Sequence, residues 1–209
     1  METPLKMRLR LARGLLVLAL ASGAAAHAQT APEGAARFEK GAEEWGLALG
    51  HGLGLGIWGS DGEDAEDVRF VGLVPRYGVG LSDPVAADAW YRGNLELLLE
   101  GALWVAYAPK GGFIGGASAM LRYNLLSWRR CVPFVELGVG VAYLEQELES
   151  QSDGLSFTPQ GGVGLHWWLS PRASLTASWR LHHLSNAGIG DDNVGINDSL
   201  LLVGLSYFP

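Results

Sequence analysis

The sequence of 209 residues contains a single cysteine, Cys131, and this excludes an internal disulfide framework. After residue 28 it also lacks any run of about 18 uncharged apolar residues, so no second helical membrane span is expected. Basic residues are scarce, with 15 Lys and Arg against 22 Asp and Glu, and the formal net charge is −7. This acidic balance argues against a nucleic-acid-binding protein.

The first 28 residues have the features of a secretory signal peptide. Lys6 and Arg13 lie in a basic segment, residues 15–21 are apolar, and Ala26 and Ala28 give a small-x-small cleavage pattern. We therefore predict a signal peptide over residues 1–28, a mobile N-terminal arm over 29–43 and one domain over 44–209. Export predicts a location in the periplasm, the outer membrane or the exterior.

The predicted domain is built of segments that alternate between apolar and polar residues. In SLTASWRLHHLSNAG, residues 174–188, Leu175 and Trp179 belong to an apolar odd series, whereas Thr176 and Arg180 belong to a polar even series. Alternation with a period of two is typical of a β-strand with one apolar face. Seven further segments share the pattern: residues 47–57, 71–81, 91–107, 113–124, 135–143, 160–167 and 199–208.

An eight-stranded barrel can bury either face, and side-chain volume decides between them. The glycine-rich, polar even series suits a narrow lumen, whereas the Leu, Tyr and Trp series is too bulky for it. We therefore predict an all-β, eight-stranded antiparallel transmembrane β-barrel with the odd series in lipid and a filled lumen. The predicted lumen residues are Arg92, Glu96, Glu100, Arg122, Glu136, His166 and Arg180. The predicted aromatic girdles contain Tyr77, Tyr91, Tyr107, Tyr123, Tyr143, Trp167, Trp179 and Tyr207.

Loop lengths indicate the orientation of the barrel. Long acidic connections at residues 60–67 and 146–154 alternate with short basic turns at 126–130 and 169–172. Outer-membrane barrels have long extracellular loops and short periplasmic turns. The strand that ends in His183 and Ser185 therefore finishes near the outer leaflet, which consists of lipopolysaccharide in a Gram-negative outer membrane.

These two residues are candidates for ester hydrolysis. A nucleophilic serine needs a base within reach and donors for the oxyanion. Residues two apart on a strand share a face, so the His183 imidazole can approach the Ser185 hydroxyl, and Asn186 or exposed N–H groups in the turn to Gly188 can serve the oxyanion. His182 and His183 face opposite sides of the strand and cannot chelate one metal, so no metal site is predicted.

The motif H-x-S-N-A-G, late in an exported eight-strand pattern, resembles that of the PagL-type lipid A 3-O-deacylases. The resemblance implies an outer-membrane serine esterase that removes the 3-O-linked hydroxyacyl chain of lipid A, a lipopolysaccharide substrate, without metal or organic cofactor. It assigns the nucleophile to Ser185, the base to His183 and the oxyanion hole to Asn186 and Gly188.

The third member of the family's triad is a Glu fourteen residues after the His, and that position holds Asn197 here. Asn197 shares odd parity with His183, and its amide oxygen can accept an imidazole N–H. Asp198 is the alternative acid, because a bulge could turn it outward. The alternative function is that of a non-enzymatic small outer-membrane barrel, an adhesin or structural protein with a decayed site. The oligomeric state stays open.

Overall fold

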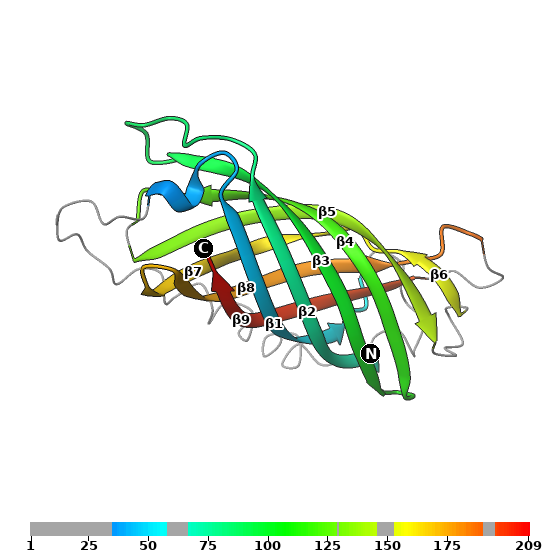
Figure 1. Cartoon of the computed structure of the whole chain (residues 1–209). Coiled ribbons are helices and arrows are strands. Elements are labelled where there is room, and N and C mark those ends of the chain that lie inside the picture. The colour runs from blue at the N-terminus through cyan, green and yellow to red at the C-terminus, as the bar shows by residue number, and fades with distance from the viewer. Residues whose placement is uncertain (1–34, 58–66, 129, 146–152, 190–194) are drawn as a thin grey trace, which may run out of the picture. The chain divides into compact units, whose positions relative to one another are not determined.

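The computed structural model describes residues 35–57, 67–128, 130–145, 153–189 and 195–209, so the predicted signal peptide lies outside the described residues. A short 3-10 helix, η2 (Ala35–Phe38), precedes a series of strands (Figure 1). They are β1 (Glu43–Gly54), β2 (Arg69–Gly80), β3 (Gly93–Ala108), β4 (Gly112–Leu125), β5 (Cys131–Glu145), β6 (Gly154–Phe157), β7 (Gln160–Ser170), β8 (Ala173–Leu184) and β9 (Ile196–Tyr207). In this part of the chain no helix is long and apolar enough to cross a membrane.

The strands form one closed antiparallel sheet. Chain neighbours pair with each other, and β1 pairs with β9 to close the barrel. β6 and β7 are two halves of one strand, because both pair with β5 in a continuous register. Pro159 lies between them, and proline has no N–H to donate to a sheet. The prediction of an eight-stranded barrel is therefore confirmed, with one of its strands interrupted.

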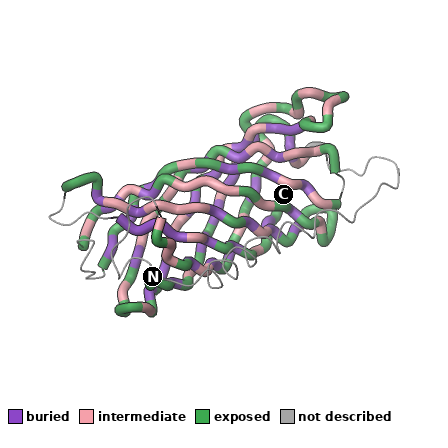
Figure 2. The backbone as a smooth tube through the Cα atoms, turned by 180° about the vertical axis from the view of Figure 1, so that it is seen from behind, coloured by how far each residue is buried: buried purple, intermediate pink, exposed green. Residues whose placement is uncertain are grey.

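Burial alternates along every strand, and Figure 2 shows the resulting stripes around the barrel. Odd-numbered apolar side chains face outward; Leu49 is 68% exposed and Leu137 is 65% exposed. Even-numbered side chains face the lumen, where Arg122 and Leu98 are fully buried. The predicted assignment of the two faces is confirmed, so the exposed apolar wall is the lipid-facing one.

A closed ring of ion pairs fills part of the lumen. Arg180 contacts Glu100 at 2.6 Å and Glu136 at 2.7 Å, so it bridges strands on opposite sides of the barrel. The remaining contacts of the ring are Glu136–Arg122, Arg122–Glu44, Glu44–Arg76 and Arg76–Glu100. The prediction of a lumen filled by paired charges is correct, but Arg92 is not among them. It lies before β3, in the β2–β3 connection, and is partly exposed.

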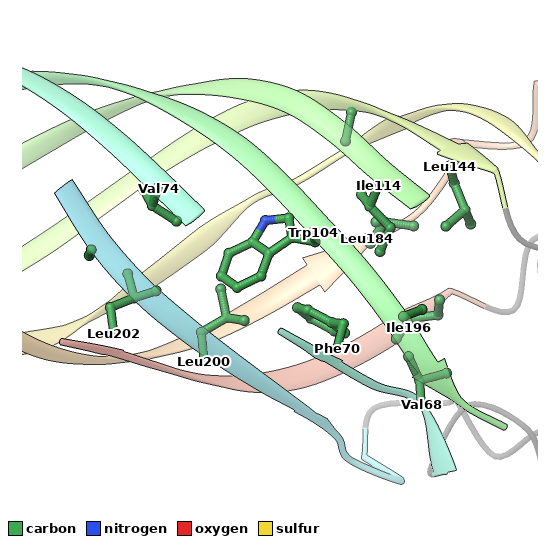
Figure 3. Close-up of a cluster of buried hydrophobic side chains, with 13 residues drawn as sticks. Val68, Phe70, Val74, Trp104, Ile114, Leu144, Leu184, Ile196, Leu200 and Leu202 are labelled. Atoms are coloured by element: carbon green, nitrogen blue, oxygen red, sulfur yellow. The ribbon is translucent and has the colours of Figure 1, made fainter. Parts of the chain in front are cut away.

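The lumen also holds an apolar cluster, which the sequence analysis did not predict (Figure 3). Trp104 and Phe70 point inward and pack edge to face, with ring centroids 5.2 Å apart. Large rings fit in so narrow an interior because glycines face them: a Cβ atom on Gly50 would lie 2.3 Å from the Trp104 ring. The volume argument thus holds for the odd series, which faces outward, but it did not anticipate bulky side chains in the even series, for which glycines on neighbouring strands provide the space.

The end of the N-terminal arm packs into the barrel mouth beside the C-terminus. Phe38 is 5% exposed, and its ring lies 5.9 Å from those of Trp168 and Phe208. Arg37 adds a cation–π contact, with its guanidinium carbon 4.4 Å from the Trp168 ring centroid. The arm thus ends in an aromatic cluster in which Phe38 is buried.

Candidate active site

The candidate residues lie at and just beyond the end of β8 and at the start of β9. The two strands pair in register, so His183 lies opposite Asn197 and His182 lies opposite Asp198. Ser185 follows Leu184, the last residue of β8, and its backbone forms a bridge with Phe157 at the end of β6. Because side chains alternate along a strand, His183, Ser185 and Asn197 lie on the same side of the barrel wall; His183 and Ser185 are half-buried there, and Asn197 is buried.

The His183 imidazole is held by Asn197. Its Nδ1 lies 2.7 Å from Asn197 Oδ1, while Asn197 Nδ2 donates to the Ile57 carbonyl at 2.5 Å. The Ile57 carbonyl can only accept, so it orients the amide with its oxygen toward the ring. His183 Nδ1 must therefore carry the hydrogen, which leaves Nε2 of the neutral ring with a lone pair. Nε2 with a free lone pair is the state that a general base requires.

Gly195 defines where the imidazole edge lies. It directly precedes Ile196, which pairs with Leu184 in the last β8–β9 pair. A Cβ atom on Gly195 would be 2.8 Å from His183 Cε1 and 3.4 Å from Nε2, which places the Nε2 edge of the ring at the Ser185 end of the strand. No hydrogen bond joins the imidazole to the Ser185 hydroxyl among the interactions of the described residues. Such bonds are often long in ligand-free enzymes.

The turn after Ser185 contains the predicted oxyanion-hole residues. Asn186 is buried, and its Oδ1 accepts a hydrogen bond from the Gly188 N–H at 2.9 Å. Ala187 and Gly188 have φ values of 53° and 78°, the left-handed conformation that folds the backbone sharply. Asn186 and Gly188 are thus brought together within one turn, and their polar groups contact each other.

Asp198, the alternative acid, lies on the other side of the wall. Its Oδ2 is 2.7 Å from His182 Nδ1, and its carboxylate is buried in the lumen. The β8–β9 register has no irregularity that would turn Asp198 outward. Asn197 is therefore the residue that the fold brings to His183, whereas Asp198 and His182 form a separate pair.

Sequence reasoning missed two contributors to the geometry, Ile57 and Gly195. Ile57 acts through its carbonyl, which the identity of a side chain does not reveal. Gly195 gave a weak signal, since a glycine between a loop and a strand often marks a close approach. Among the residues that the structure describes, no group of three His, Cys, Asp or Glu side chains is placed to hold a metal ion.

Comparisons with known proteins bear on both fold and family. The family model described as "Lipid A 3-O-deacylase (PagL)" matches residues 75–206, a span that includes every candidate residue named above. No curated protein matches the chain.

Several solved outer-membrane proteins have a similar fold. Neisserial surface protein A is 14% identical with a TM-score of 0.50, covering 80% of this chain and 99% of its own. The outer membrane enzyme PagL is 20% identical with a TM-score of 0.49, covering 78% and 97%. OprG from Pseudomonas aeruginosa is 12% identical with a TM-score of 0.49, covering 82% and 97%. The protein is a Gram-negative outer-membrane β-barrel, and by its family match the chain belongs to the PagL family of lipid A 3-O-deacylases.

Proposed function

We propose that this protein is an outer-membrane serine esterase that removes the 3-O-linked hydroxyacyl chain of lipid A. The observation that carries the proposal is the oriented imidazole of His183. Asn197 Oδ1 holds its Nδ1–H at 2.7 Å, two residues from Ser185 on the lipid-facing wall. Polar side chains are costly on that wall unless they serve a purpose, and a membrane lipid can reach them there without leaving the bilayer.

The chemistry follows from the positions of these groups. His183 Nε2 takes the proton from Ser185 Oγ as Oγ attacks the ester carbonyl carbon. The tetrahedral intermediate places a negative charge on the former carbonyl oxygen, which Asn186 and Gly188 stabilise. Collapse breaks the bond to the sugar oxygen, which takes the proton from His183 and leaves as the 3-hydroxyl. Water, deprotonated by His183, then releases the hydroxy fatty acid from the acyl-enzyme.

In this scheme the Gly188 N–H shifts from Asn186 Oδ1 toward the oxyanion. In the structure that N–H donates to the Asn186 side chain at 2.9 Å. A developing oxyanion is a stronger acceptor than a neutral amide oxygen, so the hydrogen bond is expected to be redirected as charge forms. Rotation of the Asn186 amide would then let its NH₂ group donate to the oxyanion as well.

A non-enzymatic barrel is the second candidate function, and Asn197 is the observation that favours it. A neutral amide orients the imidazole but does not stabilise the imidazolium that forms during catalysis. Loss of the carboxylate is therefore what a decayed site would contain. An adhesin or structural protein could keep the remaining geometry with no acyl transfer.

Mass spectrometry of lipid A separates the two functions. Lipid A is compared from cells that express the wild-type protein, from cells that express Ser185→Ala and from cells without the protein. The esterase predicts loss of one hydroxyacyl mass with the wild type alone, and the free hydroxy acid should appear. An unchanged profile with folded wild-type protein in the outer membrane would favour the non-enzymatic barrel.

A further inference from the structure

A second polar group lies on the lipid-facing wall, away from Ser185. His51 on β1 and Tyr107 on β3 both point outward and reach over β2 to each other. His51 Nε2 lies 2.8 Å from the Tyr107 hydroxyl, and the two rings are stacked at an interplanar angle of 16°. Within hydrocarbon such polar groups cost free energy, and a hydrogen-bonded pair held across three strands suggests contact with a polar ligand.

Arg69 stands beside this pair. It is exposed at the start of β2, opposite Leu53 on β1 and Ala108 on β3. The β2–β3 register shifts between Arg69 and Phe70, which brings Tyr107 next to Arg69. Val71, two residues along β2, lies opposite His51. The register thus places Arg69, His51 and Tyr107 at nearby positions on three adjacent strands of the outward face.

The hydrogen-bonding capacity of this group fits a phosphate. The guanidinium of Arg69 offers forked N–H donors that match phosphate oxygens. If Tyr107 donates to His51 Nε2, the ring retains an Nδ1–H donor; if Nε2 donates, the Tyr107 hydroxyl hydrogen remains. In either tautomer the pair keeps one donor beside the guanidinium. A carboxylate partner for Arg69 is absent from the described residues.

The position of the group relative to Ser185 suits one large lipid. Pairing runs from Leu181 on β8 through Ser199 on β9 and Leu53 on β1 to Arg69. Arg69 is therefore three strands from Ser185 and four residues along, which corresponds to about 20 Å between Cα atoms at strand spacings of about 4.8 Å and rises of about 3.3 Å. The arginine side chain shortens this separation toward the width of a phosphorylated disaccharide headgroup.

We propose that Arg69, His51 and Tyr107 form a phosphate-binding subsite for the headgroup of the lipopolysaccharide whose acyl chain reaches Ser185. The proposal rests on the proposed function. The subsite would hold the phosphorylated sugar against β1, β2 and β3 while the ester lies at β8. It would favour phosphorylated lipid A over lipids that lack a phosphate at that distance from the ester.

Binding can be measured without turnover in the Ser185→Ala protein, so a failure of the esterase proposal does not hide the result. Native mass spectrometry would compare adducts of phosphorylated and dephosphorylated lipid A on this protein and on versions that also carry Arg69→Gln, Arg69→Lys or Arg172→Gln. Arg172 is exposed in the turn at the opposite end of the barrel and gives the matched loss of charge. Folding is checked by heat-modifiable migration, and Arg69→Lys covers the case in which the Gln variant does not fold.

Arg69→Gln should weaken binding of phosphorylated lipid A about tenfold, as expected for loss of a charged hydrogen bond. Arg69→Lys should lose less, Arg172→Gln should match the parent, and no variant should alter binding of dephosphorylated lipid A. Equal losses on both lipids, equal losses with Arg172→Gln, or no loss would overturn the subsite. Phosphatidylglycerol serves as a competitor, and displacement of lipid A at equal concentration would show a general anionic-lipid site and overturn the assignment to lipopolysaccharide.

Discussion

Two neighbouring residue pairs on β8 and β9 differ in the wall that they face. His182 and Asp198 meet in the lumen, and His183 and Asn197 meet on the outer wall; the nitrogen-to-oxygen distance is 2.7 Å in both. The first pair contains a carboxylate and lies in the lumen, out of reach of a lipid. The second contains an amide and lies on the outer wall, where Asn197 is buried beneath the Ile57 carbonyl and His183 is half-buried. The geometry of a histidine–acceptor pair is therefore not sufficient for hydrolysis of a lipid ester, because a lipid can reach the pair only on the outer face of the barrel.

The difference in acceptor has a physical reason. A carboxylate on the outer wall brings a charge toward hydrocarbon, where its desolvation costs free energy. Asn197 avoids that charge, and its Nδ2 also satisfies the Ile57 carbonyl, which a carboxylate could not do. In the lumen His182 accompanies Asp198 as a direct partner. The amide thus orients His183 at a lower cost in stability, but without the electrostatic help of an acid.

The largest expected effect tests whether only the outer pair is catalytic. His183→Ala should reduce deacylation about 10⁴-fold or more, because a triad without its base retains little of its rate. His182→Ala is the matched control and should retain activity, since its side chain lies behind the wall. Rates are measured on purified lipid A, with folding checked by heat-modifiable migration. Abolished activity in folded His182→Ala, with His183→Ala active, would assign the base to the lumen.

A second prediction compares the two walls by stability. Glu100→Ala should destabilise the barrel by about 3 to 5 kcal/mol, because it leaves two buried arginines, Arg76 and Arg180, without a shared carboxylate. Its neighbour Leu99, 54% exposed, faces lipid, and Leu99→Ala should cost less, about 2 kcal/mol, because only the transfer of the lost methyl and methylene groups from water to lipid is forfeited and no charge is left unpaired. Urea titration of refolding into lipid vesicles measures both. Equal costs would contradict the assignment of walls.

The fold could be predicted from sequence because the odd or even number of a residue within a strand determines whether its side chain faces lipid or the lumen. The outward positions of Leu49 and Leu137 were predictable because apolar residues recur at every second position in their strands. The partners within the lumen could not be predicted in the same way. Arg180 meets Glu100 across the barrel, and such a contact depends on strand stagger and tilt, which no local pattern encodes. Trp104 was missed because its space comes from Gly50, on a strand distant in sequence.

The arrangement of the candidate residues was predictable to a similar extent. The His183-x-Ser185 spacing and the parity of Asn197 followed from the strand period. The orientation of the Asn197 amide did not, because it depends on a backbone carbonyl near residue 57. The error at Arg92 has the same origin: parity was extended into residues before β3, where the chain turns and alternation ends.

The third prediction exchanges the acceptor on the outer wall. Asn197→Ala should lower kcat about ten- to a hundredfold, because the imidazole loses the partner that fixes its tautomer, yet an Asn contributes less than the Asp whose loss costs about 10⁴. Asn197→Glu should raise kcat by adding charge stabilisation, even though the Ile57 carbonyl loses its donor. Asp198→Asn is the control and should change little. Inactivation by Asp198→Asn with a silent Asn197→Ala would reverse the assignment of the acid.

The smallest expected effect concerns Gly195, which shapes the outer pair without taking part in the reaction. Gly195→Ala places a Cβ atom 2.8 Å from His183 Cε1, so the ring must move away from the Ser185 end. The φ of 79° adds strain of roughly 1 kcal/mol for any residue with a side chain. We expect kcat to fall about tenfold, with KM little changed, because displacement by a few tenths of an ångström affects proton transfer more than binding.

Gly41→Ala is the control that separates backbone strain from displacement of the imidazole, since Gly41 has a φ of 84° but no atom within 4 Å of the added Cβ. It should lose stability to a similar degree and keep its kcat. A matching loss of kcat in both variants would show that backbone strain alone accounts for the effect, and that Gly195 does not position the imidazole.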